Sequence, residues 1–186
     1  MPKTRSHAPL LIAVAALALP IVAHARFKDA GDGDIRFRAK GPAGMKINGS
    51  ANEFQAAENN GKLVLKVSAK SLKTGIGLRD KHLRGYLEAD KCPDIKYEVD
   101  RDKLKLPAND QESTGEVTGS FTLHCVAKPM TFKYKAKRTG SDFHVQAIPV
   151  KPLDIRDHNV EVPCYLGVCV DPKIDLDIKF KLRDGG

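Results

Sequence analysis

The chain has 186 residues, of which 41% are hydrophobic and 29% are charged, and its formal net charge is +8 at pH 7. This length excludes a large multidomain protein and is sufficient to bury one hydrophobic core. The positive charge favours peripheral contact with anionic surfaces such as membrane headgroups. Because the basic residues are spread along the chain and are not clustered, a solvated outer face is the simpler interpretation.

The first 25 residues have the pattern of a secretory signal peptide. Lys3 and Arg5 precede an apolar run over Leu10–Val22, and Ala23-His24-Ala25 matches an A-x-A cleavage site. The run is too short to cross a hydrocarbon core of ~30 Å comfortably, although a retained anchor stays an alternative. Cleavage near Ala25 predicts a periplasmic or secreted domain over residues 26–186, for which we expect no nucleic-acid partner.

Alternating apolar and polar residues predict half-buried β-strands in the first part of this domain. The first strand covers Gly33–Lys40, and a turn leads to a second over Met45–Ala57. The apolar residues change parity within this second strand, so a bulge is expected near Gly49–Ala51. Asn60-Gly61 predicts a hairpin turn, after which Lys62–Lys70 alternates again.

The two-residue period stops at Thr74–Glu88, where apolar residues recur at spacings of three to five. Such spacing predicts a short helix. A helix inserted among strands has to pack onto something, and the end of a barrel or sandwich is the expected place. We therefore expect a helical cap, with Leu78, Leu83 and Leu87 facing the interior.

The second half of the chain predicts further strands and irregular connections. Val126–Pro129 reads as a turn, Leu104–Ser113 as a loop, and Pro149–Val162 as irregular chain. The alternating segments are Ile95–Val99, Gly115–Cys125, Met130–Lys137, Ser141–Val150 and Lys173–Leu182. The whole chain is thus all-β, with eight strands and one short helical insert.

Eight such strands can close as an antiparallel β-barrel or stack as a sandwich, and closure removes unpaired edges. The interior of an eight-stranded barrel is just wide enough for side chains or for one small ligand. Several inward positions are small, which fits either a cavity or a core that tapers to fill the barrel. These positions are Ala39, Gly49, Ala69, Gly119, Ala136 and Ala147.

Four cysteines in an exported domain predict two disulfides. Pairing Ile95–Val99 with Gly115–Cys125 as a hairpin places Cys92 opposite Cys125. Cys164 and Cys169 flank four residues, a spacing that suits a tight hairpin loop. We therefore predict Cys92–Cys125 and Cys164–Cys169 bonds.

Three segments resemble the YceI-like family. Ser71–Val99 contains the family's Ser-x-x-Thr-Gly and Arg-Asp-x-His-Leu motifs, Gly115–Ala136 is similar to its next hairpin, and Gly41–Phe54 to its second strand region. The resemblance covers Gly33–Leu182 and implies a lipocalin-like barrel closed at one end by the helix. One departure is Cys125, which stands where the family commonly has glycine.

The resemblance also implies a binding protein for a long apolar lipid, such as a polyisoprenoid, an isoprenoid quinone or a fatty-acid derivative. No other cofactor is expected. The cap motif would consist of Arg79, Asp80, His82 and Leu83. The inward sets give the lining candidates. Each alone is better explained as ordinary core, and only as a set around a hollow would they form a site: Phe37, Leu63, Leu65, Val67, Ile95, Tyr97, Phe121, Leu123, Phe132, Tyr134, Phe143, Val145, Leu176 and Ile178.

Other functions compete with lipid binding. A ligand-free structural or stress-related secreted barrel is the strongest alternative. Because His124 lies beside Cys125, a metal site is another alternative, but the chain has no compact zinc motif. An enzyme is a further alternative, suggested by Ser71, Asp80 and His82. The chain lacks a nucleophile elbow and a phosphate loop, so we expect no catalysis. A homodimer is compatible with the sequence.

Overall fold

The computed structural model describes residues 27–51 and 53–185, so the predicted signal peptide lies outside the described residues. The barrel strands are β1 (Phe27–Lys40), β2 (Lys46–Ala51), β3 (Phe54–Asn59), β4 (Lys62–Ser68), β5 (Asp94–Asp100), β6 (Glu112–Leu123), β7 (Val126–Thr139), β8 (Asp142–Pro149) and β12 (Lys173–Asp184). Shorter elements are β9 (Leu153–Asp154), β10 (Cys164–Tyr165), β11 (Val168–Cys169), α1 (Gly77–Tyr86), η1 (Pro42–Gly44), η2 (Ala69–Ser71), η3 (Arg101–Lys103) and η4 (Ile155–His158).

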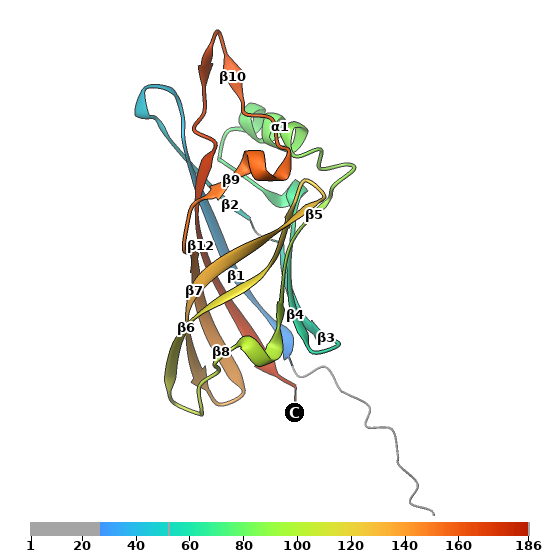
Figure 1. Cartoon of the computed structure of the whole chain (residues 1–186), viewed down its shortest axis with the longest axis vertical. Helices are drawn as coiled ribbons and strands as arrows, with labels where there is room; N and C mark the ends of the chain where they lie inside the picture. Colours follow the sequence, from blue (N-terminus) through green and yellow to red (C-terminus); the bar gives the residue numbers. More distant parts are fainter. Residues whose placement is uncertain (1–26, 52, 186) are drawn as a thin grey trace, which may run out of the picture.

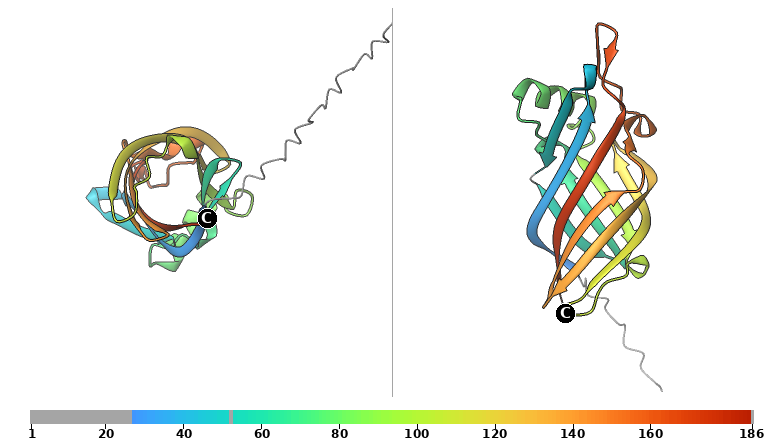
Figure 2. Two further views of the ribbon diagram at one scale, coloured as in Figure 1. Left: turned by 90° about the horizontal axis from the view of Figure 1, so that it is seen from below. Right: turned by 90° about the vertical axis from the view of Figure 1, so that its left-hand side faces the viewer.

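The strands close into one antiparallel barrel, as predicted (Figures 1 and 2). Closure occurs at β1, in which Ile35 pairs with Ala51 of β2 on one side and with Ile178 of β12 on the other. β2 and β3 together take one of the eight strand positions, because β1 pairs with both of them. The chain changes parity between β2 and β3, so the bulge expected near Gly49–Ala51 is instead a strand break after Ala51.

The hairpin between β6 and β7 differs from the expected one. Leu123 pairs with Val126, and the turn consists of His124 and Cys125, both with positive φ (49° and 59°). The predicted turn at Val126–Pro129 is therefore wrong, and these residues belong to β7. A two-residue turn with positive φ at both positions matches the twist of the flanking strands, which accounts for glycine being favoured where Cys125 stands.

The register between β5 and β6 also differs from the expected one, by one residue. Cys92 directly opposite Cys125 would place Tyr97 opposite Ser120, but Tyr97 pairs with Phe121. The two cysteines nevertheless form a disulfide, because both lie outside the paired part of these strands.

One end of the barrel is closed by packed side chains. Phe27, Phe143 and Leu182 are its largest fully buried residues. The Phe27 and Phe143 rings meet edge to face with centroids 5.5 Å apart. The Arg101 and Arg138 guanidinium groups lie over these rings, at 4.8 and 5.0 Å from the centroids. This end therefore holds an ordinary core.

The other end carries α1, η4 and the β10–β11 hairpin, which lie outside the barrel wall (Figures 1 and 2). The turn between β1 and β2 rises at the same end. Among residues 27–51 and 53–185, no helix combines the length and the apolar character needed to cross a membrane. The helical insert, α1, thus lies at one end of the barrel, as predicted from the interruption of the two-residue period (Figure 1).

Candidate functional site

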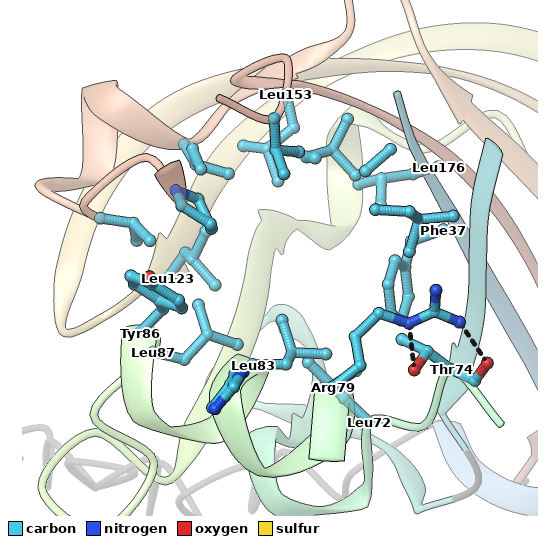
Figure 3. A pocket seen from close by; sticks show the side chains of 18 of the residues that line it. Phe37, Leu72, Thr74, Arg79, Leu83, Tyr86, Leu87, Leu123, Leu153 and Leu176 are labelled. Atoms are coloured by element: carbon cyan, nitrogen blue, oxygen red, sulfur yellow. Dashed lines mark hydrogen bonds between the residues drawn. The ribbon is translucent and has the colours of Figure 1, made fainter. Parts of the chain in front are cut away.

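A cavity of about 510 Å³ lies under α1, within the end of the barrel opposite the packed core (Figure 3). This volume falls in the range of ~300–1,000 Å³ that is typical of small-molecule sites. Strands β1, β2, β4, β5, β6 and β12 supply its walls, and α1 with the chain between β8 and β12 supplies its rim. The wall is apolar because the inward residues of each strand alternate with polar outward ones.

The structure brings half of the predicted lining residues to this cavity. They are Phe37, Val67, Ile95, Phe121, Leu123, Leu176 and Ile178. Others surround a smaller cavity of about 90 Å³ nearer the packed end: Leu63, Leu65, Tyr97, Phe132, Tyr134 and Val145. Ile35, Val67, Ile95, Phe121 and Ile178 line both cavities, so the two are adjacent. Phe143 lines neither and belongs to the closed end.

Several lining residues were not among the candidates. Ile35, Ala39 and Ile174 share the parity of candidates on their own strands, so the alternation could have identified them. Leu153, Ile155, Val160 and Val168 come from the irregular chain between β8 and β12. Such segments have no periodicity that reveals which side chains face inward, so only the tertiary structure places them.

Two of the small inward residues make room for aromatic rings and not for a ligand. A Cβ atom on Gly49 would lie 2.1 Å from the Phe37 ring. On Gly119 it would lie 2.5 Å from the Glu98 carbonyl oxygen and 2.8 Å from the Tyr97 hydroxyl. Gly49 thus makes room for a ring that lines the large cavity, and Gly119 makes room for a ring of the tapered core.

Arg79, Thr74 and Asp80 form a hydrogen-bonded chain at the rim of the cavity (Figure 3). Arg79 donates from Nε to the Thr74 hydroxyl at 2.8 Å and from Nη2 to the Thr74 carbonyl oxygen at 2.9 Å. Asp80 accepts from the Thr74 backbone N–H at 2.7 Å and from the Thr74 hydroxyl. These bonds from Thr74 hold the pKa of Asp80 below its usual value. Asp80 therefore fastens α1 to the preceding loop.

The apolar side of α1 covers the cavity. Leu83, Tyr86 and Leu87 line it, and His82 lies at the rim with an exposed side chain. Leu78 does not face the interior, contrary to the prediction, because it is 65% exposed at the start of the helix. Its place on the inner side is taken by Leu72, which precedes the helix and is buried.

Both predicted disulfides lie at this end of the barrel. The Cys92–Cys125 bond joins the chain that leaves α1 to the β6–β7 turn, with 5.3 Å between the Cα atoms. The Cys164–Cys169 bond closes the β10–β11 hairpin, whose Cys164 and Val168 line the cavity. The first bond thus fixes the chain after α1 to the barrel wall, and the second stabilises the hairpin itself.

The residues that suggested a metal site or an enzyme form other interactions. All four cysteine sulfurs are in disulfides. The His124 ring forms a hydrogen bond through Nδ1 with the His158 carbonyl oxygen at 3.2 Å. Ser71 donates to the Ser68 carbonyl oxygen at 2.8 Å, away from the Asp80 carboxylate, which Thr74 occupies. Within the described part of the chain, no three His, Cys, Asp or Glu side chains are arranged to hold a metal ion.

Comparison with known proteins supports the geometry. The family model described as "YceI-like domain" matches residues 25–182. A "UPF0312 protein" from Pseudomonas savastanoi pv. phaseolicola is 28% identical over 164 residues, covering 85% of this chain and 72% of that protein. A "UPF0312 protein PSPA7_0523" from Pseudomonas paraeruginosa is 31% identical over 117 residues, 58% of each chain.

Solved structures share the fold. A polyisoprenoid binding domain from Saccharophagus degradans, implicated in plant cell wall breakdown, superposes with a TM-score of 0.72 at 14% identity, covering 87% of this chain and 99% of that domain. Burkholderia cenocepacia BcnA gives a TM-score of 0.60 at 16% identity, covering 81% of this chain and 94% of that one.

Proposed function

The chain belongs to the YceI-like family, and from this premise we propose that it binds a long apolar lipid inside the barrel. A polyisoprenoid, an isoprenoid quinone or a fatty-acid derivative is the ligand class. The protein would sequester or carry this lipid and would not transform it chemically. A structural neighbour named as a polyisoprenoid binding domain supports this ligand class.

The hollow under α1 is the observation that carries the proposal. Its walls are almost entirely apolar, and a cavity of about 510 Å³ in a folded protein is unusual unless something occupies it. Each CH₂ group moved from water into such a site gains roughly 0.8 kcal/mol. A chain of a few isoprene units would therefore bind tightly with few polar contacts.

Filling the cavity tests the proposal. Leu176 lines the cavity from β12, and Leu176→Trp would place an indole in the hollow. We expect this variant to weaken binding of a fluorescent C16 fatty-acid probe at least tenfold while the protein stays folded. Ile148→Trp is the matched control, because Ile148 is 46% exposed on β8 and does not line the cavity. Equal affinities for all three proteins would contradict the proposal.

Native mass spectrometry of freshly purified protein separates lipid binding from the alternatives. A mass adduct that organic extraction removes is expected for a lipid carrier. A ligand-free structural barrel would show neither an adduct nor probe binding.

The homodimer that the sequence allows stays a prediction, which sedimentation velocity tests.

We propose a periplasmic or secreted location, after removal of residues 1–25. Two disulfides support it, because such bonds persist in oxidising compartments.

We further propose that the rim of the barrel contacts an anionic membrane, from which the lipid would enter. Three features of the rim support this contact: apolar tips, exposed lysines and proximity to the cavity.

The tips are exposed and apolar. Met45 in the β1–β2 turn, Leu78 on α1 and Leu166 in the β10–β11 turn are 52%, 65% and 86% exposed. Lys40, Lys46, Lys73 and Lys81 are exposed near the first two tips, without a carboxylate within 4.0 Å among the described residues. Each such lysine contributes roughly 1 kcal/mol at an anionic surface.

The β10–β11 tip is uncharged, and exposed Asp157 and Glu161 precede it in the chain. The exposed positive charge of these lysines therefore lies near the tips at Met45 and Leu78. Leu78→Glu/Leu166→Glu should reduce cosedimentation with vesicles of phosphatidylglycerol and phosphatidylcholine. Ile148→Glu, on the barrel wall, is the control and should not. Equal cosedimentation of both variants would refute contact through the rim.

A further inference from the structure

We propose that the cavity selects lipids with an anionic oxygen headgroup, a carboxylate or a phosphate, and that Arg79 is the residue that binds this group. The inference rests on the proposed function and adds to it the chemistry of the ligand's polar end. Its starting point is the positive charge of Arg79, which lies beside the apolar wall of the cavity.

Arg79 and Thr74 lie together at the rim of the cavity, and Tyr86 lies across the hollow from them (Figure 3). The described lining residues are apolar except for Thr74, Arg79, His82 and the Tyr86 hydroxyl, and none of them is an aspartate or a glutamate. Thr74, Arg79 and His82 come from α1 and the chain just before it. A long ligand can satisfy this arrangement in only one direction, with its tail in the barrel and its head under α1.

Arg79 has donors to spare. A guanidinium carries five N–H donors, and the hydrogen bonds to Thr74 use one on Nε and one on Nη2. Figure 3 shows the Arg79 side chain reaching from α1 toward Thr74 beside Phe37, at the edge of the hollow. The remaining donors are available to a group in the cavity.

The charge of Arg79 is only indirectly balanced. No carboxylate of the described residues lies within 4.0 Å of it, and Thr74 stands between Arg79 and Asp80, accepting from the first and donating to the second. The two hydrogen bonds to Thr74 also fix the orientation of the guanidinium. A fixed arginine without a direct ion pair binds a carboxylate or phosphate through paired, charge-assisted hydrogen bonds.

This arrangement also discriminates against other headgroups. An alcohol can accept one hydrogen bond from Arg79 but brings no charge. An amine brings a second positive charge to a rim that already holds Arg79 and has no acidic lining residue in the described chain. The order of affinity should therefore be phosphate or carboxylate first, alcohol second and amine last.

A series of C16 lipids with one tail and different heads tests the inference. We would measure displacement of a fluorescent fatty-acid probe at pH 7.5 by hexadecanoic acid, hexadecyl phosphate, hexadecan-1-ol and hexadecylamine. Since hydrogen bonds to a charged group contribute more than neutral ones, the acid and the phosphate should bind at least tenfold more tightly than the alcohol. Preference for only one of the two anions would identify the headgroup further.

Arg79→Met should lower the ratio of acid to alcohol affinity to about one, because the acid loses paired, charge-assisted hydrogen bonds whereas the alcohol loses at most one hydrogen bond. Lys81→Met is the matched control, because it removes an exposed positive charge from the same helix and should keep the ratio. If Arg79→Met does not fold, the wild-type series still decides. Arg79→Lys retains the charge and should keep part of the preference.

The outcomes separate this inference from the proposed function. An alcohol that binds as tightly as the acid would refute the role of Arg79 and leave lipid binding intact. An unchanged ratio in Arg79→Met would do the same. Absence of binding by every C16 compound would overturn both proposals.

Discussion

At the scale of single residues, Asp80 and Thr74 determine how the helix is attached. Asp80 lies in the first turn of α1, where a carboxylate can cap or complement the helix N-terminus. Its carboxylate instead accepts two hydrogen bonds from Thr74, three residues before the helix begins. Arg79 in turn donates two hydrogen bonds to Thr74. The three residues thus act as one unit.

The depressed pKa of Asp80 predicts a pH-dependent attachment. The hydrogen bonds from Thr74 are its largest cause, so ionised Asp80 stabilises the folded state above its ordinary pKa of about 4. This contribution is lost as the pH falls through the lowered pKa. Asp80→Asn should therefore reduce the free energy of unfolding more at pH 7 than at pH 3, measured by urea titration.

Asp90→Asn is the control for this experiment. Asp90 also has a lowered pKa, through Lys70, but its side chain is 92% exposed, and exposed ion pairs contribute little. We expect a smaller change at pH 7 for this variant. A loss for Asp80→Asn that does not depend on pH would show that its charge is unimportant.

At the scale of elements, α1 and the β10–β11 hairpin belong to the rim, and a disulfide lies at each: Cys92–Cys125 links the chain after α1 to the β6–β7 turn, and Cys164–Cys169 closes the hairpin on itself. The bond at Cys92 closes a loop with a sequence separation of 33, whereas the bond at Cys164 closes one with a separation of 5. Restricting the unfolded chain stabilises a protein more when the closed loop is longer. The two bonds therefore differ in their expected effect.

Replacing each pair by serine measures this difference. Cys92→Ser/Cys125→Ser should lower the free energy of unfolding by about 3–4 kcal/mol, and Cys164→Ser/Cys169→Ser by about 2 kcal/mol. Urea titration without reductant gives both values. Reduced wild-type protein should unfold like the variant that lacks all four cysteines. Equal losses for the two pairs would contradict the loop-length argument.

At the scale of the whole molecule, the barrel is packed at one end and hollow at the other. Phe27, Phe143 and Leu182 fill the end near the chain's carboxyl terminus, and the cavity occupies the end under α1. The aromatic rings at the packed end leave only a small cavity between the two regions. Stability and binding should therefore depend on different ends of the same barrel.

Two truncations test this separation. Phe143→Ala should lower the free energy of unfolding by about 3–5 kcal/mol, the usual result of truncating a buried phenylalanine, and change probe affinity less than twofold. Leu83→Ala, in the half-buried cap, should have the smaller effect on stability and the larger effect on affinity. Retained affinity in a folded Leu83→Ala protein would leave the cap with a structural role only.

The sequence by itself determined the all-β architecture, the helical insert and the cysteine pairs. These features depend on local order: a two-residue period specifies a strand with one buried face, and an interruption of that period marks an inserted helix. The same alternation selected inward residues such as Phe37 and Leu176, because neighbours along a strand face opposite sides.

Only the tertiary structure decided which inward residues surround a hollow. Tyr97 and Phe121 are both inward, but Tyr97 fills the space beside Gly119, whereas Phe121 lines the large cavity. Leu153 and Val168 reach that cavity from chain without periodicity, and Leu78 turns away from it. The physical reason is that a cavity depends on distances between side chains far apart in sequence, which alternation along one strand does not contain.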